Sequence, residues 1–152
     1  MSTFLTTASV AVILLVCPVV NQAQTKSSPK QLLEALATNK QKEALKLAQT
    51  ISDVNYYDKS GASLLMCSAE TGATAVCKAL LDRGADFGQR SANGITALYL
   101  AAQNGHTDVV RTLIEKGAAP DICPDNGATP LIVASEYGHA GIVRLLSEQG
   151  AN

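Results

Sequence analysis

The sequence predicts an all-α solenoid built from about four units of 33 residues. Three observations support this: glycines recur every 33 residues, apolar residues recur in the same register, and each unit carries the signals of one turn and two short helices. At 152 residues, with 47% hydrophobic and 16% charged residues, the chain is suited to one folded domain. A single unit cannot bury both faces of a helix pair, so neighbouring units have to stack.

The charge balance and composition exclude several function classes. Twelve Lys and Arg against 13 Asp and Glu give a formal net charge of −1, without the basic stripe of a nucleic-acid binder. Trp is absent and aromatic residues make up only 4%, which argues against a large aromatic cofactor site. Four cysteines are too few for a disulfide-built scaffold. We therefore expect no nucleic-acid partner and no cofactor.

Residues 1–24 contain no charged side chain and include an apolar stretch over residues 10–20. This length suits a secretory signal peptide and falls short of the roughly 20 apolar residues of a membrane-spanning helix. We predict cleavage near Ala23 or Gln24, followed by a short linker over residues 25–28. An uncleaved membrane anchor over residues 4–20 and a lipid-modified N-terminus are the alternatives. All three would place the rest of the chain outside the cytoplasm.

The repeating unit is defined by rows of glycines with apolar positions between them. Gly61, Gly94 and Gly127 close a predicted hairpin turn, where glycine tolerates a positive φ. A hydroxyl residue then caps the first helix, and another glycine ends it. The second helix carries one apolar stripe, as in Val109 and Val110. In register, the predicted caps are Ser63, Thr96 and Thr129, and the glycines that end the first helices are Gly72, Gly105 and Gly138.

Two units carry the signature of a known family. Residues 93–106 read NGITALYLAAQNGH, and residues 126–131 read NGATPL, with Gly138 and His139 after them. These motifs and the 33-residue period resemble the ankyrin repeat, and the resemblance covers residues 57–152. It implies a hairpin–helix–turn–helix fold for each unit. It also implies that His106 and His139 hydrogen-bond to backbone near the helix–helix turn and are not catalytic.

The period divides the chain into four repeats. Residues 57–89, 90–122 and 123–152 are three ankyrin-like repeats, and residues 29–56 resemble a degenerate first repeat. The first repeat lacks the turn glycines and carries several lysines along its second helix, as expected of a polar N-terminal cap. The last repeat shows no separate capping helix, so its end is expected to fray or to self-associate with another copy.

The sequence offers little catalytic chemistry. It contains no glycine-rich phosphate loop, no nucleophile elbow and no metal-ligand spacing. Cys67 and Cys77 align with apolar positions, which favours small core side chains, and a Cys67–Cys77 disulfide is the alternative. Cys123 aligns with hairpin positions, so it is the candidate for a free or intermolecular thiol. We predict that the protein is not an enzyme, with a thiol or redox role of these cysteines as the alternative.

The resemblance also implies where a partner would bind. Ankyrin repeats usually make contacts through the hairpin and the adjacent end of the first helix, which line a concave groove. Tyrosines at such positions bury a large area and keep a polar tip. Met66, Tyr99 and Ile132 would form an apolar stripe across this groove, with packing against the neighbouring helix as the alternative. The candidate groove residues are Tyr57, Lys59, Met66, Arg90, Asn93, Ile95, Tyr99, Asn104, Asp125, Asn126, Ile132 and Tyr137.

The sequence thus predicts a non-catalytic protein-binding module that acts outside the cytoplasm through a preformed groove. A membrane-tethered scaffold is the second hypothesis, and membrane contact is expected only if residues 4–20 are retained. Alanine at Tyr99 and Tyr137 is predicted to abolish binding with little loss of stability. The fold does not name the partner, because one fold serves many unrelated roles.

Overall fold

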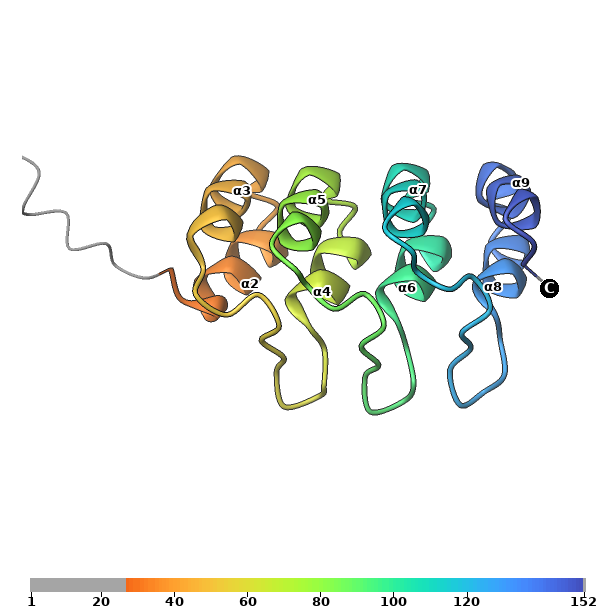
Figure 1. Ribbon diagram of the computed structural model, residues 1–152, viewed down its shortest axis with the longest axis horizontal. Helices are drawn as coiled ribbons and strands as arrows, with labels where there is room; N and C mark the ends of the chain where they lie inside the picture. The colour runs from red at the N-terminus through yellow and green to blue at the C-terminus, as the bar shows by residue number, and fades with distance from the viewer. Residues whose placement is uncertain (1–26, 152) are drawn as a thin grey trace, which may run out of the picture.

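The computed structural model describes residues 27–151, and over that range it consists of eight helices arranged as antiparallel pairs. Figure 1 shows the pairs stacked side by side in one row, which confirms the predicted all-α repeat solenoid. The predicted signal or anchor segment lies outside the described residues. The helices are α2 (Pro29–Ala37), α3 (Gln41–Thr50), α4 (Leu64–Glu70), α5 (Thr74–Asp82), α6 (Ala97–Gln103), α7 (Thr107–Glu115), α8 (Pro130–Glu136) and α9 (Ala140–Glu148).

The first helix of each of the last three repeats begins at the hydroxyl residue that the sequence predicts. The side chains of Ser63, Thr96 and Thr129 each accept a hydrogen bond from the backbone N–H three residues further on. Pro130 occupies the first turn of α8, where its missing N–H leaves no helical hydrogen bond unmade. These caps set a common starting point for α4, α6 and α8, 33 residues apart.

The two helices of each pair are connected through a residue with positive φ. Gly72, Gly105 and Gly138 have φ angles of 69°, 79° and 74°, as predicted for glycines that end a helix. In the degenerate first repeat, Asn39 occupies the same register position with a φ of 55°. Asparagine tolerates this region better than most other non-glycine residues. The first repeat therefore keeps the same helix–turn–helix path without a glycine.

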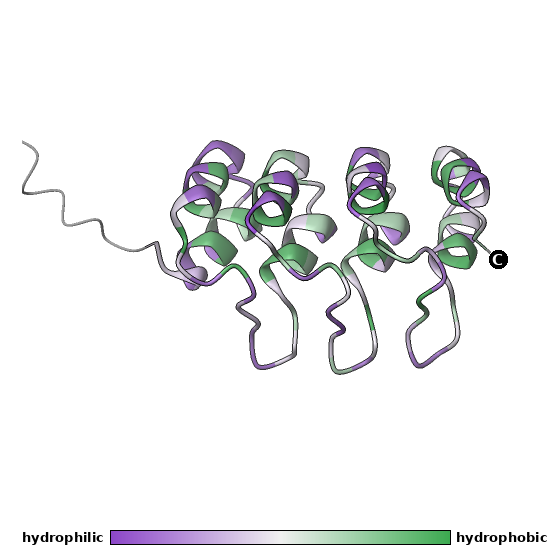
Figure 2. Ribbon diagram, viewed as in Figure 1, coloured by the Kyte–Doolittle hydropathy of each residue, from purple (hydrophilic) through white to green (hydrophobic). Residues whose placement is uncertain are grey.

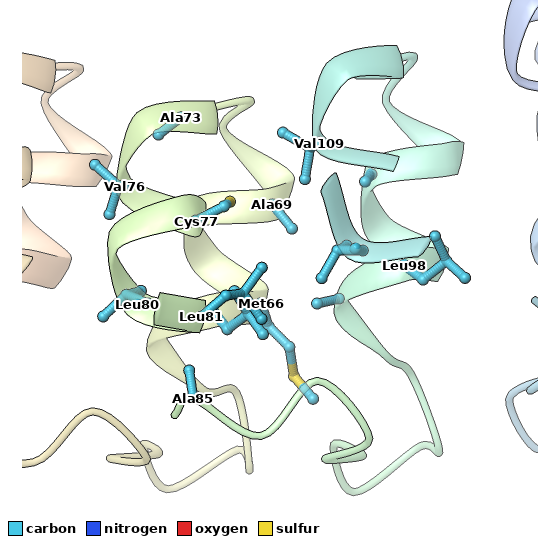
Figure 3. Close-up of a cluster of buried hydrophobic side chains, with 14 of the residues drawn as sticks. Met66, Ala69, Ala73, Val76, Cys77, Leu80, Leu81, Ala85, Leu98 and Val109 are labelled. Atoms are coloured by element: carbon cyan, nitrogen blue, oxygen red, sulfur yellow. The ribbon is translucent and has the colours of Figure 1, made fainter. Parts of the chain in front are cut away.

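The hydrophobic core lies between the two helices of each pair and between successive pairs. Figure 2 shows hydrophobic residues on the facing sides of the helices and hydrophilic residues on the outer surface of α3, α5 and α7. The buried side chains form one continuous cluster from Leu32 to Leu146. Figure 3 shows Met66 of α4 and Val109 of α7 in the space between the second and third repeats. Each repeat is therefore stabilised both by packing within its helix pair and by the adjacent repeats.

The described part of the predicted linker is packed against the first repeat. Ser28 is the N-cap of α2, and its backbone N–H donates to the side-chain oxygen of Gln31 at 3.1 Å. Ser27 is buried, and its hydroxyl lies 2.6 Å from the Thr50 hydroxyl at the end of α3. Both serines thus belong to the folded first repeat. Ser28 caps α2, and Ser27 connects the start of the repeat to the end of α3.

A side chain that the sequence did not single out connects the first repeat to the second. Arg83 donates from Nη1 to the carbonyl oxygen of Ala48 at 2.7 Å and from Nη2 to that of Ile51. These carbonyls end α3, where a cation also interacts favourably with the helix dipole. Lys116 occupies the same register position one repeat later, and it forms an exposed ion pair with Asp82 at 2.6 Å. At the first junction the cation therefore binds helix-end carbonyls, whereas at the second junction it forms only an exposed ion pair.

Candidate functional site

Hairpin loops precede α4, α6 and α8, and they extend from the same edge of the stack (Figure 1). They are called the second, third and fourth hairpins after the repeats to which they belong. Each turn is short and is closed by a glycine in the left-handed region, as the sequence predicts. Such a turn needs a positive φ, which residues other than glycine adopt only at an energetic cost. The closing glycines are Gly61 with a φ of 80°, Gly94 with 75° and Gly127 with 77°.

Neighbouring hairpins are joined to one another by backbone hydrogen bonds. The N–H of Ala92 donates to the carbonyl oxygen of Ser60 at 3.4 Å. One repeat later, the N–H of Asp125 donates to the carbonyl oxygen of Asn93 at 3.2 Å. The three hairpins therefore form one connected surface, and the side chains on it are held in a defined arrangement.

Arg90 adds a side-chain connection between the third and fourth hairpins. Its Nη2 donates to the carbonyl oxygen of Cys123 at 2.9 Å and lies 3.9 Å from Oδ1 of Asp125. Both charged side chains are largely exposed, so the ion pair is weak and leaves the carboxylate open to other partners.

The same two hairpins enclose a hollow of about 330 Å³. Five of its six lining residues are among the predicted groove residues, and the sixth, Pro124, was missed because its hairpin position showed no binding signal. A hollow of this size is near the lower limit for ligand pockets, about 300 Å³. It is suited to one side chain of a larger partner. The lining residues are Asn93, Ile95, Tyr99, Pro124, Asp125 and Asn126.

Tyr99 supplies the most buried polar side chain of this hollow. The residue is only 7% exposed, and its ring packs in the core. Its hydroxyl has no hydrogen-bond partner among the described residues. No fully buried polar side-chain atom in the described part of the chain lacks a partner, so this hydroxyl must contact solvent. The hollow, which Tyr99 lines, is where that contact can occur.

The predicted apolar stripe across the groove is wrong for two of its three members. Met66 is 1% exposed and Tyr99 is 7% exposed, whereas Ile132 is 43% exposed. In the second and third repeats, the next first helix packs over this position, with α6 on α4 and α8 on α6. No further first helix follows α8 in the described chain, so Ile132 stays exposed. Because Tyr99 is buried, we now expect Tyr99→Ala to lower stability, in contrast to the sequence-based prediction of little loss.

The remaining groove residues do not form one patch. Tyr57 and Lys59 are exposed on the second hairpin. Asn104 and Tyr137 are the C-caps of α6 and α8, at the end of each helix away from the hairpins. A seven-residue helix is about 10 Å long, which separates them from the hollow. The exposed Ile132 and Tyr137 lie in the last repeat, where self-association stays a prediction.

The two histidines make the backbone contacts that the family resemblance implied. Nε2 of His106 lies 3.0 Å from the carbonyl oxygen of Glu70, and Nε2 of His139 lies 3.0 Å from that of Gln103. Each contact reaches back to the end of the first helix in the preceding repeat. The histidines therefore connect successive repeats and satisfy carbonyls that the helix ends leave free.

All three cysteines of the described chain are free thiols. The alternative of a Cys67–Cys77 disulfide is therefore wrong for this structure, in which the Cys77 thiol donates to the Ser68 hydroxyl at 3.1 Å. Burial raises the pKa of both Cys67 and Cys77 to about 11, and the nearby carboxylate of Glu70 adds to the shift at Cys67. A raised pKa keeps these thiols protonated and poorly nucleophilic at neutral pH.

We predict that Cys67 and Cys77 resist alkylation in the folded protein at pH 8, whereas Cys67, Cys77 and Cys123 all react in urea. Their modification should accelerate only as the pH approaches 11, where the thiolates form. Unfolded thiols ionise at lower pH than these folded ones, so folding stability should fall as the pH rises from about 9 to about 11. Iodoacetamide labelling with peptide mapping checks this. Rapid labelling of either thiol at pH 8 would contradict it.

Among the described residues, no group of three or more His, Cys, Asp or Glu side chains is placed to hold a metal ion. No helix within residues 27–151 is long and apolar enough to cross a membrane.

The fold and its connected hairpins define a helical-repeat protein that presents an extended surface for recognition. A family model described as Ankyrin repeats (3 copies) matches residues 32–122 and 76–152. The chain therefore belongs to the ankyrin repeat family, whose members are generally non-catalytic modules that bind protein partners. A search of curated proteins found no match to the chain.

Proposed function

We propose that this protein is a non-catalytic interaction module that binds one protein partner through the surface formed by its three hairpins. The observation that carries the proposal is the hollow between the third and fourth hairpins, whose walls are joined by hydrogen bonds from Asp125 and Arg90. A preformed surface of this kind loses little conformational entropy when a partner binds.

The chemistry of the hairpin surface supports recognition of a protein. Tyr57 is among the large hydrophobic side chains that the described residues expose, and it extends the surface beyond the hollow. Aromatic side chains with polar neighbours are enriched in protein interfaces. Asn93 and Asp125 lie exposed beside the apolar side chains of the hollow, so the surface combines polar rim groups with a small apolar centre.

We further propose that the module acts outside the cytoplasm after removal of residues 1–24. The uncharged N-terminal stretch with its apolar residues 10–20 supports this location. Fractionation of the source cells and N-terminal sequencing of the isolated protein test it. A new N-terminus near Thr25 in the extracytoplasmic fraction is expected. An intact N-terminus in the membrane fraction would instead favour the tethered scaffold.

We predict that the double variant Tyr57→Ala/Asn93→Arg loses capture of the partner by at least about tenfold, a change of about 1.4 kcal/mol. The arginine places a long side chain at the rim of the hollow, and the alanine removes the exposed ring of the second hairpin. Pull-down with the tagged full chain, quantified by mass spectrometry, measures the effect.

The control is Lys78→Ala/Arg111→Ala, which changes two exposed cations on α5 and α7, away from the hairpins. Substitutions of exposed side chains usually alter stability by less than about 0.5 kcal/mol, and thermal melting verifies this for both variants. Equal capture by the hairpin variant and by the native chain would refute binding through the hairpins.

A further inference from the structure

We infer that the hollow between the third and fourth hairpins binds a basic side chain, lysine or arginine, from an extended segment of the partner. This inference rests on the proposed function and deepens it, because it names the chemistry that the hairpin surface selects. It follows from the shape of the hollow, from the charge of its rim and from the unpaired hydroxyl of Tyr99.

The hollow has an apolar wall that matches the stem of a long basic side chain. Pro124 is buried, Ile95 is half-buried and Tyr99 lines the hollow. Lysine and arginine lay their methylene groups along apolar surface while the charged end remains among polar groups. The volume of about 330 Å³ accommodates one such side chain.

The polar groups of the hollow favour a cation. The carboxylate of Asp125 is the only formally charged group among the six lining residues. The hydroxyl of Tyr99, whose side chain is more than nine-tenths buried, has an oxygen with no partner among the described residues. Asn93 adds an exposed amide oxygen. A carboxylate with neutral oxygen acceptors is the set of groups that a guanidinium or ammonium head binds.

Arg90 shows that a guanidinium can approach this carboxylate. Its Nη2 lies 3.9 Å from Asp125 Oδ1, too far for a hydrogen bond, while it donates to the Cys123 carbonyl at 2.9 Å. The carboxylate is therefore only loosely paired and can accept a second cation. A basic group of the partner would compete with Arg90 for Asp125, so removing the Arg90 charge should strengthen binding.

The charge of the surrounding repeats supports the same assignment. Residues 57–152, the three repeats that carry the hairpins, contain 10 Asp and Glu against 7 Lys and Arg, which gives them a net charge of −3. A field of this sign accelerates the approach of a basic segment and slows that of an acidic one.

The experiment uses blocked pentapeptides with alanine at four positions and arginine, lysine, citrulline or glutamate at the centre. These are titrated into the ¹⁵N-labelled full chain, and the amide signals of Asn93, Ile95 and Asn126 are followed by NMR. Arginine and lysine peptides should shift these signals saturably. Citrulline has nearly the same shape without the charge, and its peptide should bind at least about fivefold more weakly. The glutamate peptide should give no shift.

Variants separate the contributing groups. Asp125→Asn should weaken binding of the arginine peptide by about tenfold, and Tyr99→Phe should weaken it by about threefold, because each substitution removes one partner of the bound cation. Arg90→Gln should tighten binding by about twofold, because a competing cation is removed. The matched control is Glu136→Gln, which removes an exposed carboxylate of the same repeat that has no bonding partner among the described residues. It should leave the affinity unchanged.

Equal binding of the arginine and citrulline peptides, or equal losses in Asp125→Asn and Glu136→Gln, would overturn the inference. A protein partner whose capture depends on the hairpins but is unaffected by Asp125→Asn would also overturn it, and the proposed function would stand. If the double variant Tyr57→Ala/Asn93→Arg captures the partner as well as the native chain does, the proposed function is refuted, whatever the peptides show.

Discussion

Replacing Gly72 by alanine is expected to lower the free energy of unfolding by about 3 kcal/mol. A φ of 69° costs a residue with a side chain about 1–2 kcal/mol. The new Cβ would also lie 2.6 Å from Cε1 and Nδ1 of the His106 ring, so the ring would have to move. Its contact with the Glu70 carbonyl, worth about 1 kcal/mol, would then be lost. Urea unfolding followed by circular dichroism measures the change.

The matched control for this prediction is Gly138→Ala. Gly138 has nearly the same φ, 74°, but nothing lies within 4 Å of the position of its Cβ. Only the backbone cost of about 1–2 kcal/mol is therefore expected there. Gly105→Ala should behave like Gly72→Ala, because the ring of His139 lies 2.6 Å from its Cβ position. Equal losses for Gly72→Ala and Gly138→Ala would show that the histidine contact contributes nothing.

Replacing Arg83 by alanine is expected to cost about 2 kcal/mol and to loosen the first repeat selectively. The guanidinium donates to two carbonyls at the end of α3, and its removal leaves both without that partner. Because a repeat protein is stabilised by contacts between neighbours, the loss should concentrate at this junction. Relative to the native chain, amide hydrogen exchange should accelerate more in α2 and α3 than in α8 and α9.

Two variants test whether the forked geometry of Arg83 matters. Arg83→Lys keeps the charge but cannot reach two carbonyls in the same planar way, so it should recover only part of the stability. Lys116→Ala removes the residue at the same position of the next repeat, which forms only an exposed ion pair, and a clearly smaller loss is expected. If Lys116→Ala were as destabilising as Arg83→Ala, the special role of the first junction would be disproved.

Much of the fold was predictable because it depends on short stretches of chain repeated in register. The caps at Ser63, Thr96 and Thr129 need only a hydroxyl at the start of a helix, and the glycines after α4, α6 and α8 need only a left-handed turn. Asn39, which replaces the glycine of the other repeats, also reflects a local preference, because asparagine tolerates positive φ. The absence of a glycine kept this turn from being predicted.

The candidate site was less predictable, because side chains in the same register can have different surroundings. Met66 and Tyr99 were expected to line the groove with Ile132, yet the next helix covers the first two and leaves the third exposed. Neither Pro124 nor Arg83 carried a signal, since each acts across a repeat boundary on groups about 25–35 residues away, as in the Arg83–Ala48 contact at a separation of 35.

The amino-acid sequence by itself determined the repeat architecture and the places where its helices begin and end. These features arise from backbone preferences and from a hydrophobic period that is visible in the sequence. The structural role of His106 and His139 was implied by the resemblance to the ankyrin repeat. Only the tertiary structure decided which groove residues remain accessible, that Cys67 and Cys77 stay unpaired, and that Asp125 and Tyr99 border one hollow. Those outcomes depend on how neighbouring repeats pack, and packing fixes distances and burial that no single repeat encodes.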